Sequence, residues 1–486
     1  MSATAAAEPA RKSWRESIAA YRDRRVLAML FLGFSAGLPY ALIFPTLSRW
    51  LSEAGVSVAS IGLFSLAGLA YGFKFLWAPL ADRMPLPLLG RALGRRRSWI
   101  LLGQVGITAG LIGMALTDPR SALWTMALLA VVVAFSGATQ DIAIDAWRIE
   151  IAPQDVQGAL AGAYQLGYRI ALFAAGAGVF LLVDGLQPLA ATPAEIYYGW
   201  MIGYFAMAAL MLIGIVTTLL VREPGAQMDA ATAARERGLE AALGADRNLL
   251  GRISAWLVNA VVNPFVDFFA RNGWLAFVIL AFIGCYWLSD RVWGVMAQPF
   301  YHHVGFDKTE VALVSKSYGI IMSIVGALLG GVLIARMGTM RILLVSAALT
   351  AGTNLLFALL ALHGKSLPIL IAIISAENLA GGMAGTALIA YLSSLTNTAY
   401  TATQYALFSS FMVLPGKLLA GVSGFVVEAV GYPMFFVYTA AMGIPAVVLI
   451  LILMRRTPAV RVAGPAEERP APVLAPAAAP VPRAGR

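Results

Sequence analysis

Residues 197–221 read YYGWMIGYFAMAALMLIGIVTTLLV, a run of 25 residues that contains no Asp, Glu, Lys or Arg. A helix needs about 20 mostly apolar residues to cross the hydrocarbon core of a bilayer. Lipid offers the backbone no hydrogen-bonding partners, so only helices and closed barrels can span a membrane. The run does not alternate between apolar and polar residues as a barrel strand does. It therefore predicts a membrane-spanning helix.

Runs of this kind recur along the whole chain of 486 residues, of which 60% are hydrophobic and 12% charged. We expect spans at 26–51, 58–80, 99–117, 121–145, 157–183 and 197–221, and again at 272–301, 309–335, 340–362, 367–394, 401–428 and 432–454. The fold class that follows is an all-α membrane protein with twelve transmembrane helices in two pseudo-symmetric six-helix bundles.

The spans also set the domain boundaries. The predicted order is an N-terminal tail at 1–25, a six-helix bundle at 26–221, a linker at 222–271, a second bundle at 272–455 and a tail at 456–486. The last tail is rich in Pro and Ala and cannot bury a core, so we expect it to be disordered. In the linker, residues 247–271 carry apolar residues at helical spacing and predict an amphipathic helix on the membrane surface. This helix either fixes the distance between the bundles or has a regulatory role.

Basic residues predict the orientation in the membrane. The tails and the loops on one side of the spans carry 26 Lys and Arg residues, whereas the opposite face carries only Arg120, Lys308 and Lys365. Because basic loops stay in the cytoplasm, we expect both termini there. The net charge of +10 then reflects loops held against anionic lipid rather than nucleic-acid binding. The first 25 residues are polar and basic, unlike a cleavable signal peptide.

Metal and enzyme chemistry find few candidate residues. Cys285 is the only cysteine, which excludes a disulfide framework and a cysteine-based metal site. The three histidines are too few and too peripheral for a haem or zinc centre, so we expect no metal and no cofactor. A membrane enzyme such as an acyltransferase lacks support, because no nucleophile–base pair is visible in the spans.

The two sets of spans repeat each other. At an offset of 250 residues, Leu63 meets Leu313 near the start of the second and eighth spans. Arg169 and Lys417 each lie seven residues before a glycine in the fifth and eleventh spans. Internal duplication of a six-helix unit is typical of major-facilitator architecture.

Ionisable residues are unevenly distributed among the spans. The third, sixth, ninth and twelfth spans contain no Asp, Glu, Lys or Arg, so these four can face lipid while the other eight line a cavity. The embedded cations are Arg49, Lys74, Arg169, Arg291, Lys316 and Lys417, and the embedded acids are Asp141, Asp145, Asp290 and Glu377. The resulting charge of +2 suits a solute with carboxylate or phosphate groups. The alternative is that the cations only pair with acids and hold the helices together.

The embedded acids are candidates for proton coupling. Asp141 and Asp145 lie one helical turn apart and share a face of the fourth span. Two neighbouring carboxylates in such a place can take up and release a proton near neutral pH. The alternative is structural, because Arg148 or Arg169 could pair with them. Glu377 lies near the middle of the tenth span, where no simple structural role accounts for an acid.

Polar uncharged residues also gather in the spans. Amides suit hydroxyl and acetamido groups because each offers two donors and an acceptor. Tyrosines can stack on sugar rings, although packing is the commoner role of any single ring. The predicted substrate-binding set is Tyr40, Arg49, Lys74, Gln104, Gln140, Gln165, Arg169, Lys316, Asn378, Gln404 and Lys417.

Several motifs, taken in order, resemble the AmpG-type muropeptide permeases, a branch of the major facilitator superfamily. The resembling segments are FSAGLPY at 34–40, EAGVS at 53–57, IGLFS at 61–65, KFLWAPL at 74–80, ATQDIAIDA at 138–146, GYR at 167–169, ENL at 377–379 and ATQYAL at 402–407. The likeness covers about 26–455. Its most specific part is the ATQD run in the fourth span.

The resemblance implies import of anhydro-muropeptides, which are sugar–peptide fragments of peptidoglycan, from periplasm to cytoplasm together with protons. It places the protein in the bacterial inner membrane and, by analogy, in wall recycling and β-lactamase induction. The hydroxyl, acetamido and carboxylate groups of such a cargo agree with the amides and the positive balance found above. We expect the protein to act as a monomer.

The resemblance also implies a gate on the cytoplasmic side, between the second and third spans. Its residues are Asp82, Arg83, Arg95, Arg96 and Arg97. An insert that contains Pro and Leu separates the two parts of this motif, so the geometry of the gate stays open.

A second departure lies in the seventh span, where the family pattern Lys-Leu-Gly-Asp reads Trp287-Leu-Ser-Asp290. The expected charge at position 287 is missing, and Arg291 could compensate for it. Two rival interpretations remain. One is a carrier of another bulky anion, such as a CoA thioester or a siderophore, and the other is a sensor that binds muropeptides without transporting them.

Overall fold

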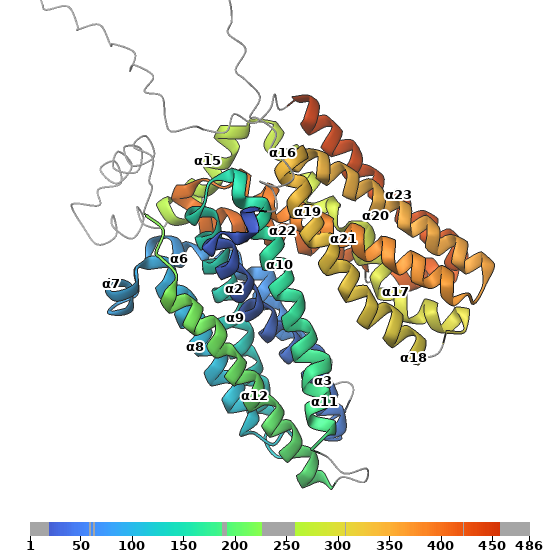
Figure 1. Ribbon diagram of the computed structural model, residues 1–486, viewed down its shortest axis with the longest axis horizontal. Coiled ribbons are helices and arrows are strands. Elements are labelled where there is room, and N and C mark those ends of the chain that lie inside the picture. The colour runs from blue at the N-terminus through green and yellow to red at the C-terminus, as the bar shows by residue number, and fades with distance from the viewer. Residues whose placement is uncertain are drawn as a thin grey trace, which may run out of the picture.

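The structure, a computed structural model, describes residues 19–57, 60–61, 64–186, 192–225, 258–306, 308–420 and 422–456. The secondary structure of these residues is helical throughout. Ten helices among them are long and apolar enough to span a membrane. Figure 1 shows two bundles side by side, one from the N-terminal half (blue to green) and one from the C-terminal half (yellow to red). The all-helical fold class predicted from the sequence is therefore confirmed.

The N-terminal half begins with one long span that is widened in the middle. It consists of α2 (Arg24–Ala41), the π-turn η2 (Leu42–Thr46) and α3 (Leu47–Glu53). Pro39 and Pro45 lack the amide hydrogens that a regular helix needs there, which accounts for the wider turn. The half continues with η3 (Ser65–Gly68), α5 (Leu69–Phe73), η4 (Lys74–Leu76), α6 (Ala78–Arg83), α7 (Leu89–Leu93), α8 (Arg95–Ala115), α9 (Leu123–Ile151), α10 (Gln157–Phe173), η6 (Ala174–Gly178), α11 (Val179–Asp184) and α12 (Pro193–Leu220).

The C-terminal half is likewise built from helices and short turns. Its elements are η7 (Val258–Val262), α15 (Asn263–Asn272), α16 (Leu275–Tyr286), α17 (Leu288–Val304), α18 (Lys308–Val311), η8 (Ala312–Tyr318), α19 (Gly319–Met337), α20 (Thr339–His363), α21 (Leu367–Leu395), η9 (Thr398–Tyr400), α22 (Thr401–Ala420) and α23 (Ser423–Arg456).

The second and eleventh predicted spans are among those that differ from the continuous helices expected. The second span, predicted at 58–80, forms short segments: the 3-10 turn η3 precedes α5, and the 3-10 turn η4 separates α5 from α6, which ends at Arg83. The eleventh span is α22 followed by the start of α23. Gly431, at φ 74°, then interrupts α23, so the predicted break between 428 and 432 coincides with a real change of direction.

Part of the predicted linker and both tails lie outside the described residues. Of the amphipathic helix expected at 247–271, the described part contains η7 and α15. Phe268 of α15 is buried at 1% exposure and packs on Phe408 of α22, with ring centroids 5.0 Å apart. The described segment is therefore joined to the second bundle by core packing.

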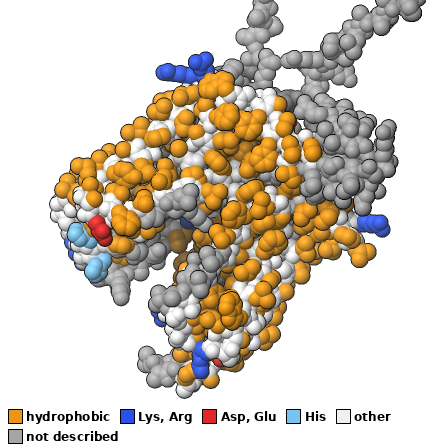
Figure 2. All heavy atoms as spheres, turned by 180° about the vertical axis from the view of Figure 1, so that it is seen from behind, with side chains coloured by type: hydrophobic (Ala, Val, Ile, Leu, Met, Phe, Trp, Pro, Cys, Tyr) orange, Lys and Arg blue, Asp and Glu red, His pale blue; other side chains and the backbone are white. Residues whose placement is uncertain are grey.

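On the face shown in Figure 2, the described side chains that face outward are largely apolar. The helices expected to face lipid carry large exposed examples, among them Val105 of α8, Val216 of α12 and Leu359 of α20. Such a surface suits a bilayer and would be unusual on a soluble protein.

Among the described residues, the main packing contacts between the two halves gather toward one side of the molecule. There α22 packs against α5, η4, α6 and α9, while α10 packs against α19 and α21. We call the side that holds α6, α15 and the start of α22 the closed side, and the side that holds α3, α11 and α18 the open side (Figure 1). Toward the open side the surface is hollowed between the two lobes (Figure 2).

Candidate functional site

The predicted acid pair lies on α9, within the N-terminal half. Asp145 is 6% exposed and has two cationic partners. Arg148 Nη2 donates to its Oδ1 at 3.2 Å, and Lys74 Nζ lies 3.9 Å from its Oδ2. The structural alternative considered for Asp145, a pairing with Arg148, therefore exists in the structure.

Asp141 has a different environment, one turn away on the same helix. The residue is partly accessible, yet its Oδ1 has no hydrogen-bond partner among the described residues. The charge of Lys74 acts on it, and Tyr71 and Tyr168 lie within electrostatic reach. The hydroxyl of Tyr71 likewise lacks a partner within the described chain. Asp141 and Tyr71 thus both have unused hydrogen-bonding capacity, and the charge of Lys74 acts on Asp141.

A second charged group joins the two halves. Glu377 of α21 and Asp290 of α17 act electrostatically on each other and on Arg169, which comes from α10 of the other half. Glu377 also accepts a hydrogen bond from the amide of its neighbour Asn378. The side chain of Arg291 lies along Gly416 of α22. The charges of Arg169 and Glu377 therefore act on each other across the two halves, and Asn378 is hydrogen-bonded to Glu377.

The predicted gate forms a dense network on the closed side. Both oxygens of Asp82 accept hydrogen bonds from the first turn of α22, from the amides of Ala402 at 2.9 Å and Thr403 at 2.7 Å. The hydroxyl of Thr403 adds a third bond at 2.6 Å. Arg96, 1% exposed, donates to Asp82 at 2.8 Å and to Glu150 at 2.5 Å. Asp82 thus links the N-terminal half to the start of a helix in the other half.

The remaining basic residues of the gate surround this network. Arg95 donates to the carbonyl of Asp82, and Arg97 donates to the carbonyl of Thr218 at 2.9 Å. The guanidinium of Arg83 lies 5.2 Å from the ring centroid of Tyr400, which belongs to the other half. All five predicted gate residues therefore lie at the closed side, and two of them reach the C-terminal half directly.

The predicted amides separate into two groups. Gln104 and Gln140 are fully buried inside the N-terminal bundle, where Ser35 lies between them and Thr218 donates to Gln104 at 2.9 Å. Gln404 is 1% exposed and bonds to Asp267 of α15 at 3.0 Å. The structure does not bring these three amides to the interface between the halves.

Gln165 is the exception among the glutamines. Its amide nitrogen lies 2.5 Å from the point where a Cβ of Gly385 would stand, and the ring of Trp287 lies 3.8 Å from the same point. Gln165 belongs to α10, whereas Gly385 and Trp287 belong to the C-terminal half. The indole that replaces the family's lysine therefore lies beside a polar group of the other half.

Tyr40 and Arg49 lie in the first span toward the open side. Tyr40 is 42% exposed and packs edge-on against Phe44 and Tyr71, with centroid distances of 4.9 and 6.0 Å. Arg49 is exposed and pairs with Glu53 on its own helix. The side chains of Lys316 and Lys417 lie outside the described part of the structure.

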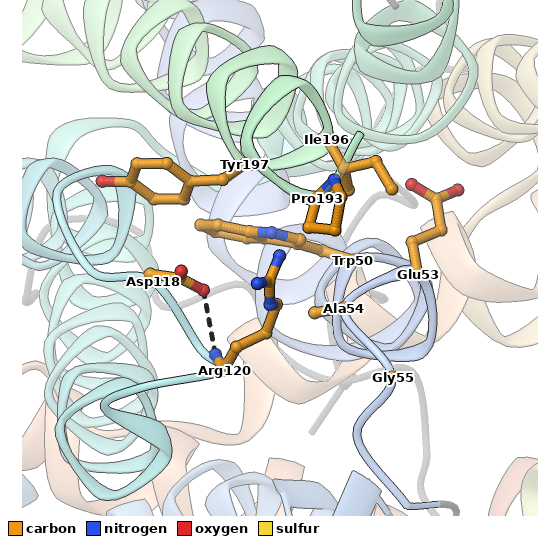
Figure 3. Close-up of a pocket in the computed structure, with 9 residues that line it drawn as sticks. All are labelled: Trp50, Glu53, Ala54, Gly55, Asp118, Arg120, Pro193, Ile196 and Tyr197. Atoms are coloured by element: carbon orange, nitrogen blue, oxygen red, sulfur yellow. Dashed lines mark hydrogen bonds between the residues drawn. The ribbon is translucent and has the colours of Figure 1, made fainter. Parts of the chain in front are cut away.

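A small cavity lies at the open side of the N-terminal half, between α3, the α8–α9 loop and the start of α12 (Figure 3). Its volume is about 130 Å³, below the roughly 300–1,000 Å³ of ordinary ligand pockets. None of the predicted site residues lines it. Among the described residues, no group of His, Cys, Asp or Glu could hold a metal ion.

Comparison with known proteins gives a consistent answer along the chain. The family described as Major Facilitator Superfamily matches residues 278–483, and the family described as Acetyl-coenzyme A transporter 1 matches residues 25–227. The anhydromuropeptide permease of Escherichia coli (strain K12) is 36% identical over 433 residues, which cover 89% of this chain and 80% of that protein. The chain belongs to the AmpG-type permeases of the major facilitator superfamily. It is accordingly a multi-pass membrane permease and not an enzyme.

Further relatives agree with this family. A protein of Rickettsia felis, named as a transporter AmpG 4, is 31% identical and covers 90% of this chain and 98% of its own length. Among solved structures, a proton:xylose symporter and an E. coli fucose:proton symporter both superpose with a TM-score of 0.63, at 12% and 15% identity, over 92% and 91% of the permease. The superposed parts make up 97% and 99% of the two symporter chains. At that identity the two symporters establish the fold alone.

Sequence reasoning missed three contacts that join the halves of the permease, made by Arg148, Tyr21 and Thr403. Arg148 donates to Ser393 Oγ of α21 at 2.7 Å, and Tyr21 donates to the carbonyl of Leu328 of α19 at 3.2 Å. Thr403 completes the contacts of Asp82. The available signal was the run Thr401–Thr403 at a helix start, because the amides of a helix N-terminus attract a carboxylate. Nothing in the sequence indicated which carboxylate would reach it.

Proposed function

We propose that this permease imports anhydro-muropeptides, of the type GlcNAc-anhydro-MurNAc-peptide, from periplasm to cytoplasm together with protons. The observation that carries the proposal is the 36% identity, along 89% of the chain, to a protein named anhydromuropeptide permease. In this proposal the permease lies in the bacterial inner membrane as a monomer with cytoplasmic termini. It supplies peptidoglycan recycling and, through it, β-lactamase induction.

Cargo recognition is assigned to the surfaces of the two halves that face each other. Arg169 would neutralise a carboxylate of the peptide, and Gln165 and Asn378 would bind hydroxyl and acetamido groups. Tyr40, exposed on α2, offers a ring on which a sugar can stack. Two observations support this set. Gln165 of α10 lies beside Gly385 of α21, and the charge of Arg169 of α10 acts on that of Glu377, to which Asn378 is hydrogen-bonded.

Proton coupling is assigned to Asp141, Asp145 and Glu377. Asp141 is supported by its unused oxygen beside Lys74, and Glu377 by its shared environment with Asp290 and Arg169. Acids embedded in a transporter commonly belong to proton pathways. Charge changes at these acids would alter the balance of attraction between the halves.

Alternating access would proceed by rocking one half against the other. The closed side would be the cytoplasmic side, latched by Asp82 with Arg83, Arg95, Arg96 and Arg97. In this proposal the hollow between the two lobes on the open side faces the periplasm in the conformation described. Release of cargo requires the bonds from α22 to Asp82 to break while the open side closes.

The test is uptake of labelled GlcNAc-anhydro-MurNAc-peptide into proteoliposomes that contain the purified permease. Uptake is measured with an inward proton gradient and again after an uncoupler is added. We expect gradient-driven accumulation that the uncoupler removes. Accumulation that ignores the uncoupler would contradict the proton coupling, and no uptake by folded protein would contradict the cargo.

A second candidate cargo is another bulky anion, in particular a CoA thioester. The match of residues 25–227 to the family described as Acetyl-coenzyme A transporter 1 favours this alternative. The same proteoliposomes distinguish the two, because unlabelled acetyl-CoA competes with the labelled muropeptide only if both use the same site. Uptake of labelled acetyl-CoA, without uptake of muropeptide, would favour the alternative.

A further inference from the structure

A row of buried charged side chains runs from Asp141 to the contact between the halves. Lys74 Nζ lies 3.9 Å from Asp145, and its charge also acts on Asp141. On the other side of Asp145, Arg148 donates to the same carboxylate at 3.2 Å. Arg148 then extends out of its own half and donates to Ser393 Oγ at 2.7 Å. A partly accessible acid is thus connected, through two cations, with a hydrogen bond between the halves.

The burial of these groups makes their pairing sensitive to any change of charge. The side chains of Lys74 and Asp145 are each 9% exposed, and that of Arg148 is fully buried. Charges attract and repel more strongly in a protein interior than in water. A buried cation that loses its partner is also left with an uncompensated cost of desolvation. A change of charge at Asp141 should therefore alter the pairing of Lys74, Asp145 and Arg148.

We infer that Lys74 and Arg148 relay the protonation state of Asp141 to the contact between the two halves. The inference rests on the proposed proton coupling and adds two positioning residues to it. It assigns Lys74 to the interior relay instead of to the cargo. Arg148 holds α9 and α21 together for as long as Asp145 holds Arg148.

The relay proceeds by competition for one carboxylate. With both acids ionised, Lys74 is attracted by Asp141 and Asp145 together. A hydronium ion from the open side gives its proton to Asp141, which becomes a neutral carboxylic acid, and a water molecule remains. Lys74 then has one anionic partner and moves closer to Asp145, where it repels Arg148 and shares its carboxylate. The hold on Arg148 weakens, and so does its bond to Ser393.

Other titratable groups face these two acids from the neighbouring elements. They are Tyr71 of α5, Tyr164 and Tyr168 of α10, and Tyr405 of α22. Tyrosines are neutral near pH 7, so the change of charge is carried by the acids and the two cations. Tyr405 adds a second contact between the halves, because the guanidinium of Arg148 lies 5.2 Å from the centroid of its ring.

A merely structural ion pair would hold the halves together equally well with Asp141 charged or neutral. A relay instead makes the closed side respond to pH through Arg148. Ser393 permits a matched comparison, because its neighbour Ser394 bonds at 2.7 Å to the carbonyl of Tyr391 on its own helix. Ser393→Ala removes a bond between the halves, whereas Ser394→Ala removes a bond within α21.

The experiment measures the separation of the halves in the full-length permease without cargo. Cys285, the only native cysteine, is replaced by Ser, and spin labels are placed at the exposed positions Arg24 of α2 and Met337 of α19. Distance distributions are recorded in lipid nanodiscs from mildly alkaline to mildly acidic pH. Uptake of labelled muropeptide is measured in parallel with the same variants, prepared without spin labels.

We expect acid to reduce the closed population of the wild type, and Asp141→Asn to reduce it at every pH. Loss of a hydrogen bond from a charged group shifts such an equilibrium roughly tenfold, so Ser393→Ala should open the closed side by about that factor while Ser394→Ala matches the wild type. Arg148→Met should abolish the response to pH.

Each contrary result overturns a defined part. Equal behaviour of Ser393→Ala and Ser394→Ala, or a normal pH response in Arg148→Met, would refute the relay while leaving muropeptide uptake by the wild type intact. A wild type whose uptake ignores the proton gradient would instead refute the proposed coupling, on which the relay rests.

Discussion

At the scale of single residues, Asp82 has the densest set of contacts between the halves. Its carboxylate accepts bonds from Arg96, from two backbone amides of α22 and from the hydroxyl of Thr403. The amides belong to a helix N-terminus, which carries a partial positive charge. A negative charge at this position therefore stabilises the closed side through both a cation and a helix end.

Substitution of Asp82 tests this role of the negative charge. Asp82→Asn keeps the shape of the side chain but removes the charge and replaces one acceptor oxygen by a donor. Hydrogen bonds to a charged acceptor are worth about 1.5–3 kcal/mol each. We therefore expect the fraction of molecules in which the halves separate at the closed side to rise at least roughly tenfold. Spin-label distances between the halves measure the effect.

Thr403→Val is the matched control for that substitution, since it removes only the hydroxyl bond and leaves both amides in place. We expect it to shift the equilibrium by less than Asp82→Asn. An Asp82→Asn permease that stays as closed as the wild type would exclude Asp82 from the latch.

Residue-scale prediction from sequence was best for charges and weakest for amides. A buried charge needs a partner, and Arg148 was visible three residues from Asp145 as one candidate. The partners of Gln104 and Gln404 instead include Thr218 and Asp267, which lie more than a hundred residues away in the chain. An embedded amide that already has such partners looks, in the sequence, the same as one that is free to bind cargo.

At the scale of elements, a close contact between α2 and α10 depends on glycine. A Cβ at Gly167 of α10 would lie 1.9 Å from the carbonyl oxygen of Leu30 in α2. Gly176, in the same span, has no neighbouring atom within 4 Å of its missing Cβ. Two glycines nine residues apart therefore have different structural roles.

These two glycines give a prediction with an internal control. Gly167→Ala must push α2 and α10 apart and, like other overpacked substitutions, should cost about 1–3 kcal/mol of stability. Gly176→Ala should leave the stability unchanged or slightly raised, because alanine favours the helix. Thermal unfolding of both variants in detergent measures the difference. Equal melting temperatures would mean that the helices do not pack this closely.

The start of α2 should respond to pH through its cap. Asp23 accepts a hydrogen bond from the amide of Arg25 at 2.8 Å and pairs with its guanidinium at 2.7 Å. The side-chain hydrogen bond from Arg25 holds the pKa of Asp23 below its ordinary value of 3.8. A lowered pKa means that the ionised acid stabilises the folded helix start. This contribution is present above pH 3.8 and disappears as the pH falls through the lowered value.

Hydrogen exchange in the first turn of α2 checks the cap. Asp23→Ala should speed exchange there, since loss of a helix cap costs about 1 kcal/mol. Asp23→Asn keeps the cap but has no charge to lose. As the pH falls, amide protection from exchange should therefore decrease in the wild type more than in Asp23→Asn. Parallel pH profiles of the wild type and Asp23→Asn would contradict the role of the carboxylate.

The sequence predicted most elements because long apolar runs in a membrane have few alternatives to a helix. The prediction of a continuous helix failed in the second span, because a high mean hydropathy does not reveal positions of low helix propensity. Gly68 and Gly72 lower helix propensity there, and the structure has 3-10 turns on either side of α5. Those turns place Lys74 where it reaches Asp145, so the broken helix is part of the candidate site.

At the scale of the whole molecule, duplication in the sequence predicted two bundles but not where they touch. The bundles meet through limited surfaces, mainly those of α10 and α22, on the closed side. Two conformations of a carrier differ in free energy by only a few kcal/mol, so composition and spacing cannot select one. The contacts of Asp82, Arg148 and Tyr21 favour the conformation described here, and each joins residues that are hundreds of positions apart.

If transport requires these surfaces to separate, a covalent bond across them should stop it. The Cβ that Gly158 of α10 lacks would lie 3.2 Å from Cβ of Ile334 of α19, close to the separation of about 3.5–4.5 Å in disulfides. In the Cys285→Ser background, we expect Gly158→Cys with Ile334→Cys to form a disulfide under oxidation and to lose uptake. Reduction should restore uptake, and each single cysteine variant should be insensitive to both treatments. Full uptake by completely cross-linked protein would mean that α10 and α19 stay together throughout the cycle, and rocking of the halves at this surface would be wrong.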